Sequence, residues 1–253
     1  MLTLVTGTNH QYFLHLRQLL DNITAVCNNT DIPTRIVVYD LGMTDQERGF
    51  LETHYMDSEI DVVKFNFAMY PDHVSLDKYY GYNCTYAWKG VLFHEVCEKY
   101  GGHVYWVDTR NRLDGVNKVV DILKRVGIYC PVSCGLVGQW THKTTIKNME
   151  AYRHLNNVCR NGAIIGINYD NDWCRSLIKD WKDTCLDKEC IAPSGSNRSN
   201  HRQDQAILTI LYYKYQCMYN FEMVDHCVDV HVHNKLRPEY AELPHNNSMS
   251  LDK

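Results

Sequence analysis

The sequence predicts an α/β fold, in which a mostly parallel sheet is flanked by helices. Three observations indicate this class. Short apolar runs alternate with amphipathic segments through the first half of the chain, in the order that gives parallel strands joined by crossover helices. Apolar residues make up 45% of the 253 residues, enough for one sizeable core. No repeat or linker interrupts the pattern, so we expect one domain over residues 1–236 and a polar, frayed tail over 237–253.

The first half alternates strand and helix patterns. Apolar side chains at helical spacing predict a helix that ends near Val26. The pair Thr44 and Glu47 has the spacing of a capping box, and Gly101 with Gly102 closes a later helix. The expected elements are strands over 2–7, 34–42, 61–67 and 103–108, with helices over 9–26, 44–55 and 85–101.

The second half is less regular. Trp140 is expected to end a strand. Asn200 fits the N-cap of the last helix, with Gln203 at the reciprocal capping position. Asp204 then lies in or just after the first turn, where a carboxylate also favours the helix dipole. The patterns predict helices over 115–127, 144–155, 171–186 and 201–216, and strands within 127–140 and over 162–170.

Charge and motifs exclude several classes of function. The net charge of -4 gives no overall basic surface for nucleic acid. No apolar run reaches the roughly 18 residues that span a membrane, and the N-terminus lacks a signal-peptide pattern. Neither G-x-G-x-x-G nor a P-loop motif is present, so those phosphate sites are not expected. We expect a cytoplasmic protein, in the host cytoplasm if it is viral.

The eleven cysteines lack the paired spacings of zinc sites and disulfide frameworks. Mainly reduced thiols are therefore expected. One observation points the other way, because Asn22, Asn28, Asn83, Asn197 and Asn246 each open an N-x-S/T sequon. A Golgi-lumen fragment without its anchor is thus the alternative location. A cysteine-rich metal-binding or redox protein is an alternative class that only composition favours.

Polar side chains follow several of the predicted strands. Parallel sheets bind ligands at the carboxyl ends of their strands. The segment from Thr6 to Asn9, the carboxylates of Asp40 and Asp108, and the residues after Phe67 should therefore share one edge. Lys89 lies in the first turn of a predicted helix, where a cation opposes the helix dipole, so a functional role explains it better than local stability.

Seven segments of the chain, taken in their order along the sequence, resemble the nucleotide-sugar-binding part of a GT-A glycosyltransferase. The resemblance extends to the nucleotide-diphospho-sugar transferase-like group that includes the DUF1647 and DUF616 families, and it covers about residues 3–215. It implies a GT-A-type, Rossmann-like sheet with a donor-binding half over 1–113 and a less regular acceptor-side half over 114–236. The matching segments are "LVTGTNHQYF", "RIVVYDLGMTDQE", "VVKFNFAMYPDHV", "TYAWKGVLFHEV", "VYWVDTRNRL", "CGLVGQWTHKTTIKNM" and "NHRQDQAILTILYY".

The resemblance also implies a metal. GT-A enzymes usually carry an Asp-x-Asp motif after this strand, whose carboxylates hold Mn²⁺ or Mg²⁺ against the donor diphosphate. Here the motif reads Asp108-Thr109-Arg110, so the second carboxylate is replaced by a cation. Either Asp108 binds the metal, with His231 or His233 as late ligands on one side of a strand, or Arg110 and Arg112 neutralise the diphosphate directly. A structural alternative is that Asp108 pairs with Arg110.

Further site residues follow from the same resemblance. Asp204 would contact the transferred sugar or remove the acceptor proton, with His201 and Arg202 as catalytic neighbours. Trp140 and His142 would face an acceptor. The expected donor-binding residues are Thr6, Gly7, Asn9, Asp40, Lys89, Asp108, Arg110 and Arg112.

The expected function is transfer of a sugar from a UDP- or GDP-sugar to a hydroxyl acceptor on a glycan, protein or other molecule. The alternative is a catalytically inactive GT-A domain that binds a glycan or a partner. The missing second aspartate favours the alternative, whereas Asp204 and Lys89 favour the enzyme. The donor, the acceptor and the stereochemical outcome are left open.

Overall fold

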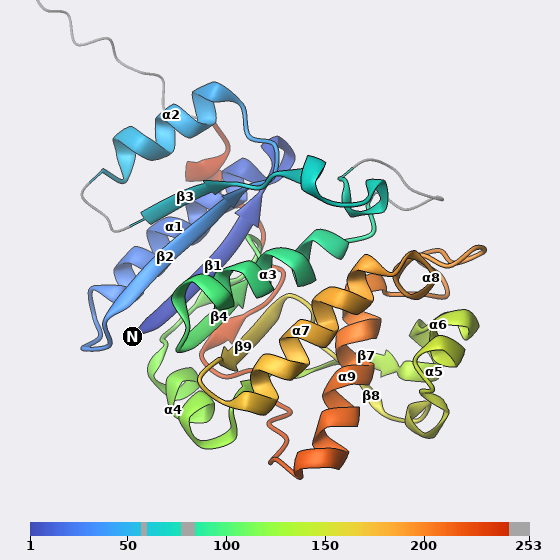
Figure 1. Cartoon of the computed structure of the whole chain (residues 1–253). Coiled ribbons are helices and arrows are strands. Elements are labelled where there is room, and N and C mark those ends of the chain that lie inside the picture. Colours follow the sequence, from blue (N-terminus) through green and yellow to red (C-terminus); the bar gives the residue numbers. More distant parts are fainter. Residues whose placement is uncertain (57–59, 77–83, 243–253) are drawn as a thin grey trace, which may run out of the picture.

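The computed structural model describes residues 1–56, 60–76 and 84–242. Within these residues the central sheet has six strands in the order β3-β2-β1-β4-β9-β6 (Figure 1). The strands are β1 (Leu2–Thr8), β2 (Thr34–Asp40), β3 (Ile60–Lys64), β4 (His103–Val107), β6 (Ile128–Tyr129) and β9 (Ile164–Asn168).

The sheet is mostly parallel, as predicted. β1 pairs in parallel with β2 on one side and with β4 on the other, where Val5 lies opposite Trp106. β2 pairs in parallel with β3. Strand β9 runs antiparallel to β4, with Ile164 opposite Val107, so the start of β9 lies at the edge where β4 ends. Both halves of the chain therefore reach that edge.

Helices cover both faces of the sheet (Figure 1). One layer contains α3 (Ala87–Tyr100), α7 (Asp172–Leu186) and α9 (Gln203–Tyr219), and α1 (Phe13–Cys27) and α4 (Asn117–Val126) lie on the opposite face. The apolar stripe predicted for α1 is confirmed, because its members are all buried: Phe13, Leu16, Leu19, Leu20 and Ile23.

Helix α2 (Asp45–His54) begins as its sequence predicts. The Thr44 side chain accepts a hydrogen bond from the Glu47 N–H, and the Glu47 carboxylate accepts one from the Thr44 N–H. These two bonds satisfy backbone donors that a helix start otherwise leaves unpaired.

The second half holds shorter elements. β5 (Arg112–Leu113) pairs with β10 (Val230–His231), and β7 (Val132–Leu136) pairs with β8 (Val158–Arg160), both antiparallel. The short helices are α5 (Val137–Trp140), α6 (Lys143–Asn148) and α8 (Lys188–Ile191), with 3-10 turns at Tyr152–His154 and Pro238–Tyr240. The 3-10 turns at His10–Tyr12, Phe67–Met69 and Asp72–Val74 belong to the first half.

Three local predictions in this half are wrong. Trp140 ends the helix α5 and not a strand. The predicted helix over 144–155 stops at Asn148, because Glu150 has a left-handed φ of 49° that no α-helix continues through. Asn200 does not cap α9, since its side-chain oxygen accepts the Asn197 N–H, and the helix begins only at Gln203.

The C-terminal tail is ordered for longer than predicted. Residues 237–242 lie against α1, where the Tyr240 hydroxyl donates to the Asp21 carboxylate at 2.7 Å. The Arg17 guanidinium donates to the Glu242 carbonyl at 2.7 Å. A polar sequence therefore does not leave this segment frayed. The rest of the predicted tail, 243–253, lies outside the described residues, as do the sequons at Asn83 and Asn246.

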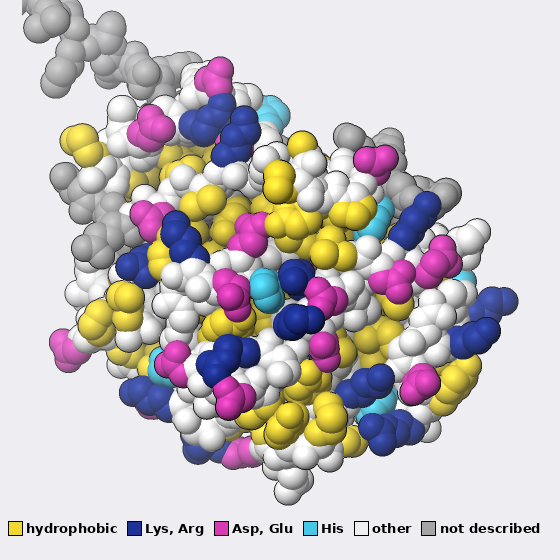
Figure 2. Space-filling view, in the orientation of Figure 1, with side chains coloured by type: hydrophobic (Ala, Val, Ile, Leu, Met, Phe, Trp, Pro, Cys, Tyr) yellow, Lys and Arg dark blue, Asp and Glu magenta, His cyan; other side chains and the backbone are white. Residues whose placement is uncertain are grey.

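The surface carries acidic and basic side chains intermixed on the face shown in Figure 2. All eleven cysteines fall within the described residues, and each is a free thiol. Among the described helices, none has the length and apolar character that crossing a bilayer requires.

Helices α3 and α7 pack closely at Gly90. A Cβ atom there would lie 2.8 Å from the Cys185 sulfur, too short for an ordinary contact. The aromatic rings of Phe93 and Trp181 meet in the same interface, with centroids 5.9 Å apart. Glycine at position 90 is therefore a packing requirement, even though glycine weakens a helix.

We predict opposite effects of alanine at two helical glycines. Gly90→Ala should lower the free energy of unfolding by about 1–3 kcal/mol, because overpacking outweighs the gain in helix propensity. Gly49→Ala in α2 should raise it by about 0.5–1 kcal/mol, since a Cβ there meets no atom within 4 Å. Urea unfolding of both variants tests this. Equal changes in the two variants would contradict the packing argument.

Candidate active site

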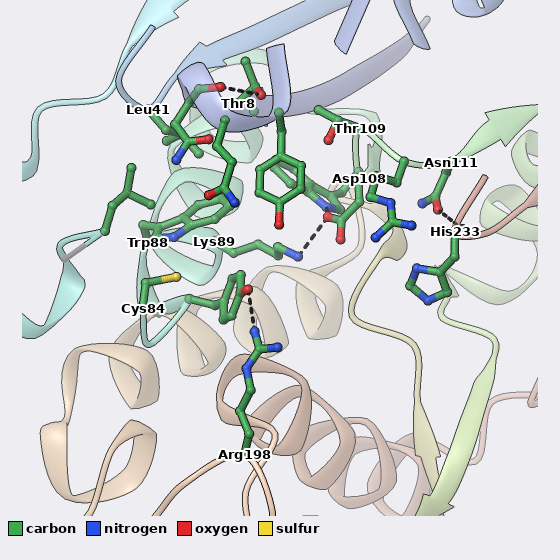
Figure 3. A pocket seen from close by; sticks show the side chains of 18 residues that line it. Thr8, Leu41, Cys84, Trp88, Lys89, Asp108, Thr109, Asn111, Arg198 and His233 are labelled. Atoms are coloured by element: carbon green, nitrogen blue, oxygen red, sulfur yellow. Dashed lines mark hydrogen bonds and ion pairs between the residues drawn. The ribbon is translucent and has the colours of Figure 1, made fainter. Parts of the chain in front are cut away.

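A pocket of about 370 Å³ opens where β1 and β4 end. Figure 3 shows Thr8 and Leu41 on one side of it, Trp88 and Cys84 on another, and Asp108, Thr109, Asn111 and His233 together on a third. This is the sheet edge that the strand order predicts. The described residues that line it are Gly7, Thr8, Asn9, Gln11, Tyr12, Leu41, Leu76, Cys84, Tyr86, Trp88, Lys89, Trp106, Asp108, Thr109, Arg110, Asn111, Arg198 and His233.

Lys89 is the buried cation of the pocket wall. It lies in the first turn of α3, and its side chain is 5% exposed. The ammonium donates to the Asp108 carboxylate at 2.9 Å and to the Gly162 carbonyl at 3.0 Å. A carboxylate oxygen of Asp204 lies 3.9 Å away. Three oxygen groups from β4, from the turn before β9 and from α9 thus surround one ammonium group, which explains why this helix tolerates a lysine at its start.

Asp108 is held at the end of β4 from several sides. Its backbone N–H donates to the Ala163 carbonyl at 3.0 Å. Its Oδ1 atom accepts hydrogen bonds from Lys89 and, at 2.5 Å, from the indole N–H of Trp106. The side chain is nevertheless 38% exposed and lines the pocket. The structural alternative, in which Asp108 pairs with the neighbouring Arg110, is therefore wrong. Asp108 pairs with a lysine from α3.

Asp204 lies behind Lys89 and is almost inaccessible. Its side chain is 8% exposed, and it is not among the residues that line the pocket. Burial raises the pKa of Asp204 to about 7, against the opposing charge of Lys89, and the Asp108 carboxylate adds to the increase. Burial disfavours the charged form of Lys89, but Asp108 and Asp204 together raise its pKa above the usual value. The ammonium therefore stays charged, and Asp204 is the member of the cluster that exchanges a proton near neutral pH.

Two arginines enter the pocket from different segments. Arg110 follows β4 and is exposed. Arg198 comes from the loop between α8 and α9, and it donates to the Tyr86 hydroxyl at 2.8 Å (Figure 3). Within the described chain, neither guanidinium forms an ion pair with a carboxylate. Sequence analysis missed Arg198, because a single arginine in a Ser- and Asn-rich loop has no distinguishing pattern.

Six of the residues predicted for donor or metal binding line this pocket, and four others do not. The Thr6 side chain is buried within β1. Arg112 pairs with Asp114 at 2.9 Å in the neighbouring two-stranded sheet. The six that line the pocket are Gly7, Asn9, Lys89, Asp108, Arg110 and His233.

Asp40 is the third predicted residue outside the pocket lining. Its carboxylate accepts the N–H groups of Gly42 and Met43 and pairs with Arg48 at 2.8 Å. Burial alone would raise the pKa of Asp40, but these hydrogen bonds and the Arg48 charge lower it below the usual value. The carboxylate therefore stabilises the turn that follows β2, and it has no oxygen directed at a ligand in the pocket.

Apart from Asp204, the predicted catalytic and acceptor residues lie together in a second place. The Arg202 guanidinium lies 4.1 Å from the Trp140 ring centroid. His142 accepts the Thr144 N–H and so caps α6. His201 is fully buried between the His142 N–H and the Ile191 carbonyl, and burial lowers its pKa to about 4. These residues join α5, α6 and the start of α9, and none of them lines the pocket.

The expected metal ligands do not assemble. His231 pairs with Asp114 at 2.5 Å, whereas His233 has a left-handed φ of 57° and lines the pocket. The two histidines therefore do not share one side of a strand. Asp108 Oδ1 already accepts from Lys89 and Trp106. Among the described residues, no three His, Cys, Asp or Glu side chains are placed to hold a metal ion. The described residues therefore do not form a set that fits Mn²⁺ or Mg²⁺.

No protein-family model matches the sequence, and no curated protein matches it. The expected resemblance to the DUF1647 and DUF616 group therefore stays an expectation. Solved structures do match. The galactosyltransferase LgtC, in complex with donor and acceptor sugar analogues, is 18% identical with a TM-score of 0.53, over 83% of this chain and 70% of LgtC. The bifunctional glycosyltransferase WbbM is 12% identical with a TM-score of 0.55, over 85% of this chain and 38% of WbbM. The fold is thus of the GT-A type.

We predict that Asp204 makes stability depend on pH. An unfolded aspartate releases its proton near pH 3.8, whereas folded Asp204 keeps it until about pH 7. The folded state binds the extra proton between these values, so its contribution to stability falls as pH rises from about 4 to about 7.

Asp204→Asn should remove this dependence, because the amide keeps the shape of the side chain without the titration. Urea unfolding of both proteins at several pH values measures the difference. Asp172→Asn, at a position 94% exposed, controls for the loss of a surface carboxylate. A wild-type-minus-variant difference that is constant from pH 4 to pH 8 would contradict the assignment.

Proposed function

We propose that the protein is a glycosyltransferase that moves a sugar from a nucleoside-diphosphate donor to a hydroxyl acceptor. The observation that carries the proposal is the composition of the pocket. Arg110 and Arg198 line one pocket at the ligand-binding edge of a GT-A sheet. The same pocket is lined by the accessible carboxylate of Asp108 and by the aromatic side chains of Tyr86 and Trp106. A volume of about 370 Å³ lies within the usual range of small-molecule sites.

Each part of a sugar nucleotide has a suitable counterpart in this pocket. A diphosphate is bound well by guanidinium groups, which donate two parallel hydrogen bonds. Aromatic faces suit the base or the apolar face of a sugar. A carboxylate such as Asp108 accepts hydrogen bonds from sugar hydroxyl groups. The solved complex of LgtC holds donor and acceptor sugar analogues, which supports the same class of ligand here.

The reaction breaks the bond between the anomeric carbon and the diphosphate oxygen. The diphosphate leaves with the bonding electrons, and the acceptor hydroxyl oxygen forms the new bond. The proton of that hydroxyl passes to the departing diphosphate or to solvent water. The arginines would stabilise the negative charge that develops on the leaving oxygen. Asp108, fixed by Lys89 and Trp106, would orient the donor sugar for attack.

Asp204 has a different role in this proposal from the one expected of it. Because Asp204 lies behind Lys89 and outside the pocket lining, we assign it to positioning the lysine and not to direct contact with substrate. His201 and Arg202 belong to the second group of residues, around α5 and α6, and are likewise given no catalytic role.

The second candidate function is a GT-A domain that binds a glycan or partner without turnover. Two observations favour it. Arg110 stands where the family carries its second aspartate, and the late-helix Asp204, which could act as a base, is buried. Both functions predict binding of sugar nucleotides or glycans, so turnover is the property that separates them.

We predict that the purified protein releases UDP or GDP from one or more UDP- or GDP-sugars, faster when its acceptor is present. Asp108→Asn should lower kcat/KM by about tenfold or more, because a charged partner of the substrate is lost. Nucleotide release measured over a panel of donors and acceptors tests this.

The matched control is Asp114→Asn, which removes a 47% exposed carboxylate a few residues further along the chain but outside the pocket lining. It should leave kcat/KM unchanged. Binding of donors without any release of nucleotide would favour the inactive module. Equal losses in the two variants would contradict the role of Asp108.

A further inference from the structure

We infer that this pocket binds the donor diphosphate through Arg110 and Arg198 without a divalent cation, because Lys89 already fills the position between the acidic side chains. The inference rests on the proposed function and adds to it how the donor's charge is neutralised. GT-A enzymes usually use a metal for that purpose, so the two possibilities differ in a measurable way.

The first step of the argument is the environment of Lys89. Its ammonium has the Asp108 carboxylate at 2.9 Å, the Gly162 carbonyl at 3.0 Å and the Asp204 carboxylate at 3.9 Å. Carboxylate and carbonyl oxygens are the groups that hard cations select. Here an ammonium, fixed to the backbone of α3, occupies the centre of that set. A divalent ion at the same place would meet its positive charge at close range.

The second step is the orientation of Asp108. Among the described residues that line the pocket, Asp108 carries the carboxylate that could also reach a metal, yet its Oδ1 atom accepts from both Lys89 and the Trp106 indole. These donors reduce the negative charge available to an added cation. Arg110, two residues further along the chain, replaces a second carboxylate with a positive charge at the pocket wall.

The third step is the supply of positive charge. Arg110 is exposed to the pocket and forms no ion pair with any described carboxylate. The charge of Arg110 also reaches His15 on α1. The pKa of His15 is lowered mainly by burial and, in second place, by the Arg110 charge. An unpaired guanidinium at a pocket wall is a group that gains from an anionic ligand.

Arg198 supplies the same chemistry from another segment. Its guanidinium donates to the Tyr86 hydroxyl at 2.8 Å and lies 5.8 Å from the centre of that ring. Tyr86 is the residue just before α3, with a left-handed φ of 56° that turns the chain into the helix. The phenol thus holds one side of the guanidinium, and among the described residues no other hydrogen-bond acceptor takes its remaining N–H groups. The two arginines reach the pocket from after β4 and from before α9.

The test measures binding of UDP and of GDP to the whole chain by isothermal titration calorimetry, once with EDTA and once with Mn²⁺. We expect the tighter of the two nucleotides to bind with the same Kd in both conditions. Arg110→Ala and Arg198→Ala should each weaken that binding by about tenfold or more, since a charge-assisted hydrogen bond to phosphate is lost. Arg110→Lys should recover only part of the loss, because an ammonium lacks the planar fork.

Arg125→Ala is the matched control. It removes the same charge from an exposed arginine on α4 that pairs with Glu222 and lies outside the pocket lining, and it should leave the Kd unchanged. Circular dichroism confirms that each variant is folded.

The outcomes separate the inference from the proposed function. Binding that requires Mn²⁺ overturns the inference and leaves the glycosyltransferase proposal standing. Binding in EDTA that neither arginine variant weakens also overturns it. Failure of the folded wild-type protein to bind UDP or GDP in either condition removes both proposals.

Discussion

The burial of one ammonium group, that of Lys89, determines how the two halves of this protein meet. A charge taken out of water is tolerated only when oxygen partners replace its hydration. Here they come from Asp108 after β4, from Gly162 before β9 and from Asp204 on α9. These three segments lie far apart in the sequence, so the sheet, the reversed strand β9 and the helix layer must all be in register for the lysine to be satisfied. The same contacts form one wall of the pocket.

The sequence predicts the first half of the fold well because its signals are local. Alternating apolar runs define β1 to β4, the Thr44 and Glu47 pair defines one helix start, and a lysine that opposes the helix dipole singles out Lys89. The second half depends on tertiary contacts that no local pattern encodes. Asn200 bonds within its own loop and not to α9, and Trp140 packs against Arg202 in a short helix. Burial separates Asp204 from the pocket, and burial cannot be inferred from spacing.

The fold and the site support function to different degrees. TM-scores of 0.53 to LgtC and 0.55 to WbbM establish a shared sheet and helix arrangement at identities of only 18% and 12%, but a fold supports many activities. The side chains at the pocket decide the chemistry. They lie at the sheet edge where parallel sheets bind ligands. Lysine and arginine side chains stand there beside Asp108, the carboxylate that was expected to bind a metal ion.

The antiparallel direction of β9 has a consequence for how this site tolerates change. Because the strand starts at the ligand edge, it presents main-chain carbonyls there: Gly162 accepts from Lys89, and Ala163 accepts from the Asp108 N–H. Every amino acid has such a carbonyl, but position 162 has little room for a side chain, because a Cβ there would lie 3.2 Å from the Gln205 Cβ. A slip of β9 by one position would displace both carbonyls and turn every side chain of the strand to the other face. The two acceptors therefore depend on the alignment of the strand and on a small residue just before it.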